Sequence, residues 1–314
     1  MECRLVCNQP GRPIIRSALA RTVYERMIQE NQLRNFDHKK WYECDLSIVD
    51  EQIASKFHKM SYDNETDEFL QNCYQKSDWL FTQMFKSLAR AFLGIFMTAT
   101  SINGLLKRGS MFVFSNEQFN LLYDELGSIK SDPEALLLDL GSGDGCVTSI
   151  MSKYFHQTYC TEISTVMKKL LAKRGYKVLD PEKWTDNDLS YDLITCLNLL
   201  DRCDRPITMM KKIRSKIKPN GRVLIALVFP LNQYVESSNN AHKPTETLPV
   251  VGSNLEEQVE SFVRNVIEPN DFELLKWTKL PYLSEGDLDL SYYWLIDVVF
   301  LIKPKQNSEA PSNQ

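Results

Sequence analysis

The 314-residue sequence has no continuous apolar run of the roughly 18 residues that a membrane-spanning helix needs. It also lacks an apolar stretch at residues 1–7, so we expect no secretory leader and favour an intracellular, cytoplasmic protein. Basic residues are not in excess, because 37 Lys and Arg stand against 41 Asp and Glu and are scattered along the chain. We therefore do not expect nucleic acid as a partner.

Cysteine and histidine are sparse, at eight and four residues, and the chain has no Cys-x-x-Cys and no close Cys/His pair of the kind that binds structural zinc. We therefore expect reduced thiols in the core and no metal site. Apolar residues make up 43% and charged residues 25% of the sequence, which are ordinary globular values and exclude global disorder and coiled-coil rods.

Composition and periodicity divide the chain into four parts. Residues 1–44 form an N-terminal segment that we predict to be partly flexible, and residues 45–130 a helical extension. Residues 131–303 carry short apolar runs and are predicted to form the main domain. Residues 304–314 are polar and rich in Pro, Asn and Ser, which predicts a disordered tail.

Two amphipathic patterns predict helices in the extension. Apolar residues recur at three- and four-residue steps over residues 46–60 and again over residues 80–95. Ser115 and Gln118 have the spacing of a capping box, so a further helix is predicted to begin near Asn116.

From residue 135 the pattern changes to short apolar runs separated by helical stretches. The runs are residues 135–140, 157–162, 191–196 and 222–229. Such alternation predicts a parallel sheet with right-handed crossovers. Residues 272–282 and 292–303 are extended segments with no helix between them, so we expect an antiparallel pair at the edge of the sheet.

The strongest motif is a buried strand that leads into three alternating glycines and then a helix, LLLDLGSGDG at residues 136–145. Glycine lets the backbone turn sharply and lets a ligand lie against it, and the following helix N-terminus offers free N–H groups. We interpret the loop as a site for a nucleoside-bearing cofactor, contacted by Gly141, Ser142 and Gly143. The spacing differs from the Gly-x-Gly-x-x-Gly of dinucleotide folds.

Two carboxylates flank this loop. Glu162 ends the next apolar run about 20 residues after Gly141, where an acidic side chain accepts the ribose hydroxyls in nucleotide-binding folds. An incidental surface glutamate is the alternative. Asp139 at the strand tip is a candidate to hold a ligand ammonium group, with a structural aspartate that bonds loop N–H groups as its alternative. Residues 180–184 follow the next strand, where we expect an adenine contact.

Together these features resemble the class I S-adenosylmethionine-dependent methyltransferases. The segment CLNLLDRCD at residues 196–204 more specifically resembles the methyltransferase-like protein 9 family of protein-histidine N-pros-methyltransferases. Residues 101–114, 257–259 and 280–287 agree with that family, and the resemblance covers residues 41–304.

The resemblance implies an α/β fold with a Rossmann-like, seven-stranded class I methyltransferase sheet whose last strand is antiparallel, plus the N-terminal helical extension. It implies S-adenosyl-L-methionine as cofactor. Its implied partners are substrate proteins with His-x-His motifs, in which x is small and the pros nitrogen receives the methyl group. The family also allows the endoplasmic reticulum or the mitochondrion as location, and we favour a monomer.

The resemblance also assigns residues. Asp139, Gly141 and Glu162 match cofactor contacts, Asn198 and Asp201 match the loop beside cofactor and substrate, and Tyr282 and Tyr293 match tyrosines near the acceptor.

The chemistry suggests a role for each acceptor-side residue. Asp201 is the candidate to accept a hydrogen bond from the tele N–H of the imidazole, which leaves the pros nitrogen free to attack. Asn198 is the candidate to bridge cofactor and acceptor, and Tyr282 and Tyr293 to wall the pocket.

Each of these roles has a structural alternative. Asp201 is also a candidate helix N-cap, with Asp204 as its competitor for that position. Asn198 has the alternative of satisfying backbone groups, and both tyrosines that of simple packing. For the whole protein, a small-molecule methyltransferase and a non-catalytic cofactor-binding scaffold remain as rival functions.

Overall fold

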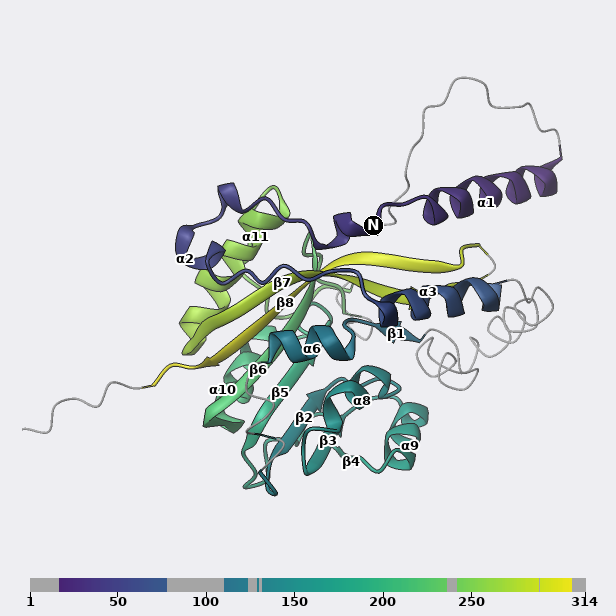
Figure 1. Ribbon diagram of the computed structural model, residues 1–314. Coiled ribbons are helices and arrows are strands. Elements are labelled where there is room, and N and C mark those ends of the chain that lie inside the picture. Colours follow the sequence, from purple (N-terminus) through teal and green to yellow (C-terminus); the bar gives the residue numbers. More distant parts are fainter. Residues whose placement is uncertain are drawn as a thin grey trace, which may run out of the picture.

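The computed structural model describes residues 17–77, 110–123, 129, 132–235, 242–287 and 289–306. These residues form one sheet of eight strands in the order β1-β7-β8-β6-β5-β2-β3-β4, with helices on both faces (Figure 1). The strands are β1 (Met111–Phe112), β2 (Leu136–Leu140), β3 (Gln157–Thr161), β4 (Lys177–Leu179), β5 (Tyr191–Leu197), β6 (Ile217–Phe229), β7 (Phe272–Glu285) and β8 (Tyr292–Pro304).

Eight α-helices lie in the described part of the chain. They are α1 (Ala18–Arg34), α2 (Glu51–Ala54), α3 (Asn64–Ser77), α6 (Asn116–Leu122), α8 (Cys146–Ser152), α9 (Thr165–Lys173), α10 (Pro206–Lys216) and α11 (Leu255–Phe262). The shorter turns are His38–Tyr42, Leu46–Ile48, Val263–Ile267 and Glu268–Asn270. Among the described residues, none of the helices is both long and apolar enough to cross a bilayer.

The sheet confirms the predicted α/β topology. Strands β4, β3, β2, β5 and β6 are parallel, whereas β8 runs antiparallel to both β6 and β7. The predicted number of seven strands is wrong by one, because the short strand β1 pairs with the end of β7, with Met111 opposite Ser284. Two residues are too few for a period-two pattern to be visible in the sequence.

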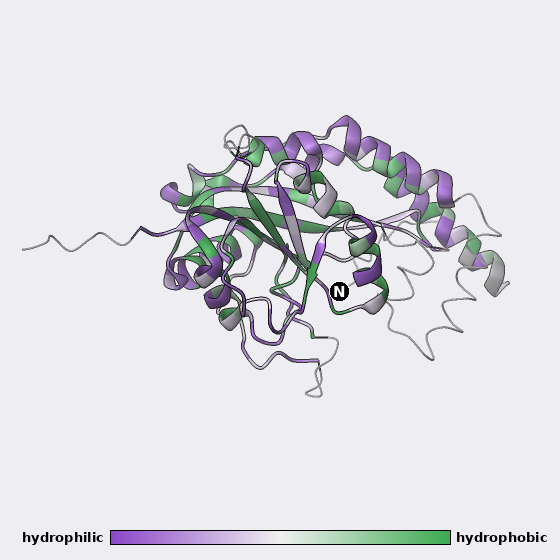
Figure 2. Cartoon of the chain, turned by 90° about the horizontal axis from the view of Figure 1, so that it is seen from below, coloured by the Kyte–Doolittle hydropathy of each residue, from purple (hydrophilic) through white to green (hydrophobic). Residues whose placement is uncertain are grey.

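Two apolar layers bury the sheet. On one face α10 and α11 supply Met210 and Phe262, and on the other α6 and α8 supply Phe119 and Met151. Figure 2 shows the central strands coloured mainly as hydrophobic, while the outer helices mix hydrophilic and hydrophobic residues. The strands are therefore rigid supports for the loops that follow their carboxyl ends.

The N-terminal extension departs from its predicted form. Residues 46–60 are not one amphipathic helix but a series of short turns, each started by an aspartate side chain. Asp45 accepts a hydrogen bond from the backbone N–H of Ser47, and Asp50 accepts one from that of Gln52. Because each aspartate side chain binds nearby backbone N–H groups, the chain forms short capped turns in place of the single helix that apolar periodicity alone predicts. The pattern at residues 80–95 lies outside the described residues, as does the predicted boundary at 130–131.

The helix predicted at Asn116 is confirmed, with its capping box. The Ser115 hydroxyl accepts from the Gln118 N–H at 3.0 Å, and the Gln118 side chain accepts from the Ser115 N–H at 3.0 Å. Ser115 is fully buried and also donates to a carboxylate oxygen of Asp63, which ties α6 to the start of α3.

Ser115→Ala removes both bonds of the Ser115 hydroxyl while leaving the backbone in place. We expect the free energy of unfolding to fall by about 1–2 kcal/mol, measured by urea denaturation. The exposed Ser149→Ala is the matched control and should change the stability little. Equal stability of the Ser115 variant and the wild type would contradict this capping role.

Candidate functional site

The glycine-rich loop follows β2 and has the shape that a nucleoside-bearing cofactor requires. Gly141 and Gly143 have φ values of +72° and +55°, which side chains with a Cβ rarely adopt. A Cβ placed on Gly143 would meet no atom within 4 Å, so the loop leaves open space above its backbone. The N–H of Gly141 and that of Ser142 donate to the Thr161 carbonyl, which holds the loop against the end of β3.

Glu162 lies where the sequence places it, directly after β3. Its carboxylate accepts from the Gly143 N–H at 3.0 Å and from the N–H groups of Ile163 and Ser164 at 2.8 Å. An incidental surface glutamate would not be held by three backbone donors from two loops. Each carboxylate oxygen can accept more than one hydrogen bond, so the predicted ribose contact remains chemically open to Glu162 and stays a prediction.

Asp139 faces inward from the tip of β2. Its two carboxylate oxygens accept from the hydroxyls of Thr148 and Thr195 at 2.5 and 2.6 Å, and its side chain is only 3% exposed. Burial raises the pKa of this carboxyl, although the two hydroxyl bonds oppose the rise. Asp139 thus anchors β2 to β5 and α8, and its predicted contact with a ligand ammonium group stays a prediction.

One exposed apolar residue beside the glycine-rich loop was not singled out from the sequence. Ile163 is 80% exposed, and its backbone N–H donates to the Glu162 carboxylate at 2.8 Å. Of the residues expected at the adenine, Trp184 has its side chain buried in the core, and the adenine contact of residues 180–184 stays a prediction. An apolar residue directly after the strand-end acid is the signal that would have identified Ile163.

The two residues predicted for the acceptor side lie in the loop after β5. Asn198 has a φ of +52°, and its backbone N–H donates to the Ala226 carbonyl on β6. Asp201, three residues later, is 2% exposed, and one of its oxygens contacts Arg202 Nε at 3.3 Å. Burial raises the pKa of the Asp201 carboxyl, and the Arg202 charge opposes the rise. The two predicted residues therefore lie in one loop at the end of the strand.

A third residue, Asp297 on β8, joins this pair and was missed in the sequence. Its side chain is fully buried, and its Oδ2 accepts from Asn198 Nδ2 at 3.1 Å. Burial raises the pKa of Asp297 to about 8; the Asn198 hydrogen bond opposes this rise and the charge of Asp201 adds to it. A single acid inside the apolar run of β8 carries no spacing signal, so only the folded sheet identifies it.

Three buried oxygens of this cluster have no hydrogen-bond donor among the described residues. They are Oδ1 of Asn198, Oδ1 of Asp201 and Oδ1 of Asp297. Buried acceptors without donors cost free energy unless a ligand or water supplies the donor. A ligand that brings N–H or O–H groups to these three oxygens would remove this cost.

The two predicted tyrosines differ in position. Tyr282 on β7 lies on the same face as Asp297, because Tyr282 is opposite Leu295 and Leu280 is opposite Asp297. Burial raises the pKa of its hydroxyl, the charge of Asp297 adds to the rise and that of Arg202 opposes it, and the hydroxyl contacts Met111 Sδ at 2.7 Å. Tyr282 therefore shares a face with Asp297, and its role at the acceptor stays a prediction.

Tyr293 lies further along the hairpin formed by β7 and β8. Its side chain is 39% exposed, and its hydroxyl donates to Asp287 at 2.8 Å. The structure does not place it with the three buried oxygens, so its acceptor role stays a prediction.

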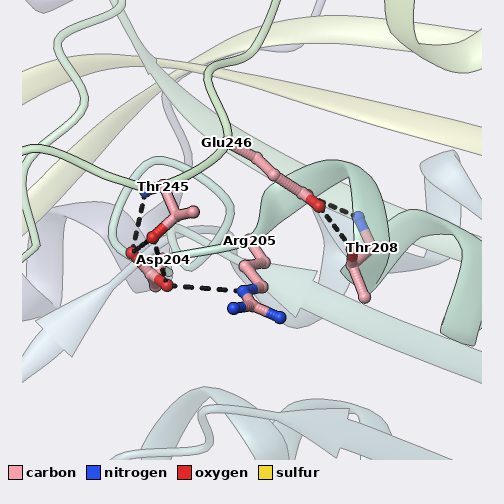
Figure 3. Close-up of polar contacts among 5 residues, drawn as sticks. All are labelled: Asp204, Arg205, Thr208, Thr245 and Glu246. Atoms are coloured by element: carbon pink, nitrogen blue, oxygen red, sulfur yellow. Dashed lines mark hydrogen bonds and ion pairs between the residues drawn. The ribbon is translucent and has the colours of Figure 1, made fainter.

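The long segment after β6 is fastened to the acceptor loop. Asp204 accepts from the Thr245 N–H and hydroxyl, and Glu246 accepts from the N–H and hydroxyl of Thr208 (Figure 3). These bonds lower the pKa of both carboxyls.

The start of α10 tests the capping alternative for Asp201. The residue at its N-cap position, Arg205, makes no side-chain cap bond, and Glu246 supplies the acceptor there instead. The cap alternative for Asp201 and Asp204 is therefore wrong.

A known protein family matches this chain. The family model of the DREV methyltransferases matches residues 41–304, which is most of the chain. The chain belongs to the DREV methyltransferase family. Methyl transfer is therefore its class of chemistry, and the family agrees with S-adenosylmethionine as the cofactor of the glycine-rich loop.

Solved structures show weaker likenesses. The ribosomal protein L11 methylase from Lactobacillus delbrueckii subsp. bulgaricus is 14% identical, with 62% of this chain and 82% of that chain covered and a TM-score of 0.37. An S-adenosylmethionine-dependent methyltransferase from Clostridium acetobutylicum is 14% identical, with 60% and 99% covered and a TM-score of 0.36. YcgJ from Bacillus subtilis is 12% identical, with 62% and 100% covered and a TM-score of 0.40. At these scores the likenesses carry no argument about function.

Glu162→Ala tests the cofactor side. Loss of a charged hydrogen-bond acceptor should weaken binding of S-adenosylhomocysteine by about 1.5–3 kcal/mol, measured by titration calorimetry. Glu134→Ala, which removes an exposed carboxylate before β2 at the end opposite the glycine-rich loop, is the matched control and should bind as the wild type does. Unchanged affinity in the Glu162 variant would remove this residue from the cofactor site.

Asp297→Asn tests the buried acid through its pH dependence. Between about pH 4 and pH 8 the unfolded Asp297 carboxyl is ionised whereas the folded one keeps its proton, so raising the pH favours unfolding. The stability of the wild type relative to this variant should therefore fall between pH 5 and pH 8 in urea titrations. A difference that stays constant with pH would show that Asp297 ionises normally in the folded protein.

Proposed function

We propose that this chain transfers the methyl group of S-adenosylmethionine to the pros nitrogen of histidine in His-x-His segments of other proteins. The single observation that carries the proposal is the cluster of buried, donor-free oxygens at Asn198, Asp201 and Asp297, beside the glycine-rich loop. A neutral imidazole brings one N–H donor and one nitrogen lone pair, which is the combination that such a cluster can orient. The resemblance of residues 196–204 to protein-histidine methyltransferases supports the same acceptor.

The two halves of the site lie against each other. A Cβ on Gly141 would come within 3.1 Å of the Leu199 side chain, so the loop that carries Asn198 packs on the cofactor loop. Asp139 reinforces this contact, because it bonds Thr195 on β5. An acceptor held at Asp201 is therefore next to a cofactor held at Gly143 and Glu162, and holding both reactants together removes much of the entropic cost of transfer.

Asp201 directs the acceptor ring. When bound, S-adenosylmethionine supplies a methyl group on a positively charged sulfur. An imidazole has an ordinary pKa near 6.5, so at pH 7 most of it is neutral and needs no strong base. Asp201 Oδ1 accepts the tele N–H and so keeps the proton on that nitrogen. The lone pair of the pros nitrogen would form the new N–CH3 bond as the S–CH3 bond breaks, and the electron pair of that bond would stay on sulfur, which leaves as the neutral thioether. Asp201 would then accept the tele proton that the cationic product ring loses.

Asp201→Ala should abolish most turnover on a His-x-His peptide, by about 100-fold or more, while the affinity for S-adenosylhomocysteine stays near that of the wild type. Asp201→Asn is the matched variant: it keeps the shape but loses the charge and one acceptor oxygen, so it should also be slow. Turnover is measured with isotope-labelled cofactor. Near-normal turnover in both variants would remove Asp201 from the mechanism.

The substrate class is tested with the wild-type protein. Transfer of the label to metabolites in place of peptides would favour a small-molecule acceptor.

A further inference from the structure

The hydrogen bond between Asn198 and Asp297 fixes which end of the Asn198 amide faces away from β8. The amide nitrogen Nδ2 donates to Asp297 Oδ2 at 3.1 Å, and this oxygen can accept whether the Asp297 carboxyl is ionised or carries a proton on its other oxygen. The carbonyl oxygen Oδ1 is then on the other side, where it is buried without a donor. The backbone is held as well, because the Asn198 N–H donates to Ala226.

Packing alone does not explain an acid at position 297. Its cross-strand neighbours are apolar, Val228 on β6 and Leu280 on β7. In the described part of the chain no lysine or arginine forms an ion pair with Asp297, while the nearby Arg202 pairs with Asp201. A buried acid without a cation costs stability whether it is ionised or neutral, and an apolar residue of similar size would not carry this cost.

We propose that Asp297 is a positioning residue for methyl transfer, which holds the Asn198 amide so that its carbonyl oxygen, not its nitrogen, faces the acceptor. The inference rests on the proposed function and adds a residue and a reason to it. An amide nitrogen at that place would donate a hydrogen bond to the lone pair of the pros nitrogen and block its attack. With acceptor oxygens from both Asn198 and Asp201 around the ring, the lone pair is left for the methyl group.

Asp297→Leu removes the acceptor that orients the amide and matches the apolar surroundings. We expect kcat on the peptide to fall about 10- to 100-fold, with the melting temperature equal or higher and the affinity for S-adenosylhomocysteine within a few-fold. Asp297→Asn leaves either amide orientation possible, so its loss should be smaller. Glu273→Gln, a carboxylate-to-amide change at the far end of β7, is the matched control and should keep the wild-type kcat.

An exchange of the two residues is the decisive variant. In the double variant N198D/D297N the hydrogen bond is kept with its direction reversed, and position 198 has only oxygens to present. Its kcat should return to within a few-fold of the wild type and exceed that of N198D alone, in which two buried carboxylates face each other. A kcat of the double variant no higher than that of N198D, or a wild-type kcat in Asp297→Leu, would overturn the proposal.

A readout without substrate separates this inference from the proposed function. The side-chain amide signal of Asn198 in ¹⁵N NMR, identified by its absence from N198D, should shift in Asp297→Leu and stay in place in Glu273→Gln. An unchanged signal in Asp297→Leu overturns the inference, whatever the acceptor is. Failure of the wild type to methylate any His-x-His peptide instead overturns the proposed function.

Discussion

The hydrogen bond from Asn198 to Asp297 depends on the strand order more than on any local motif. Strand β8 lies beside β6, which lies beside β5, so an acid near the end of the chain comes within 3.1 Å of the loop that follows β5. A sheet whose last strand ran parallel, or lay outside β7, would not bring these residues together. The antiparallel insertion of β8 is thus the constraint on which the proposed acceptor site depends.

Polar bonds inside the sheet couple the cofactor loop to the acceptor loop. Asp139 on β2 bonds Thr195 on β5, and Glu162 after β3 bonds Gly143 in the glycine-rich loop. The bond from Gly143 to Glu162 holds the glycine-rich loop in place. The bond from Thr195 to Asp139 ties the strand before that loop to β5, the strand that leads to Asn198 and Asp201. The tie between Asp204 and Thr245 holds the acceptor loop from its other side. Preorganisation of this kind is how a protein places two reactants without moving at the moment of transfer.

The sequence was informative wherever one local rule decided the structure. The capping box at Ser115, the glycines after β2 and the apolar runs of the strands each have a period or spacing of their own, and the structure confirms them. The prediction failed at residues 46–60, because aspartate side chains compete with helix hydrogen bonds there. Asp297 was not predicted because its partner, Asn198, is 99 residues away in the sequence. Periodicity and spacing report only local structure, so they do not show which distant residues meet in a sheet.

One measurement tests most directly the central claim that the pros nitrogen of a peptide histidine accepts the methyl group. The full-length protein is incubated with labelled S-adenosylmethionine and a His-x-His peptide, and the hydrolysed product is compared by mass spectrometry and retention time with both methylhistidine standards. The label is expected in pros-methylhistidine alone. Label in the tele isomer, or none in the peptide, would contradict an acceptor ring held by Asp201 with its pros nitrogen toward the methyl group.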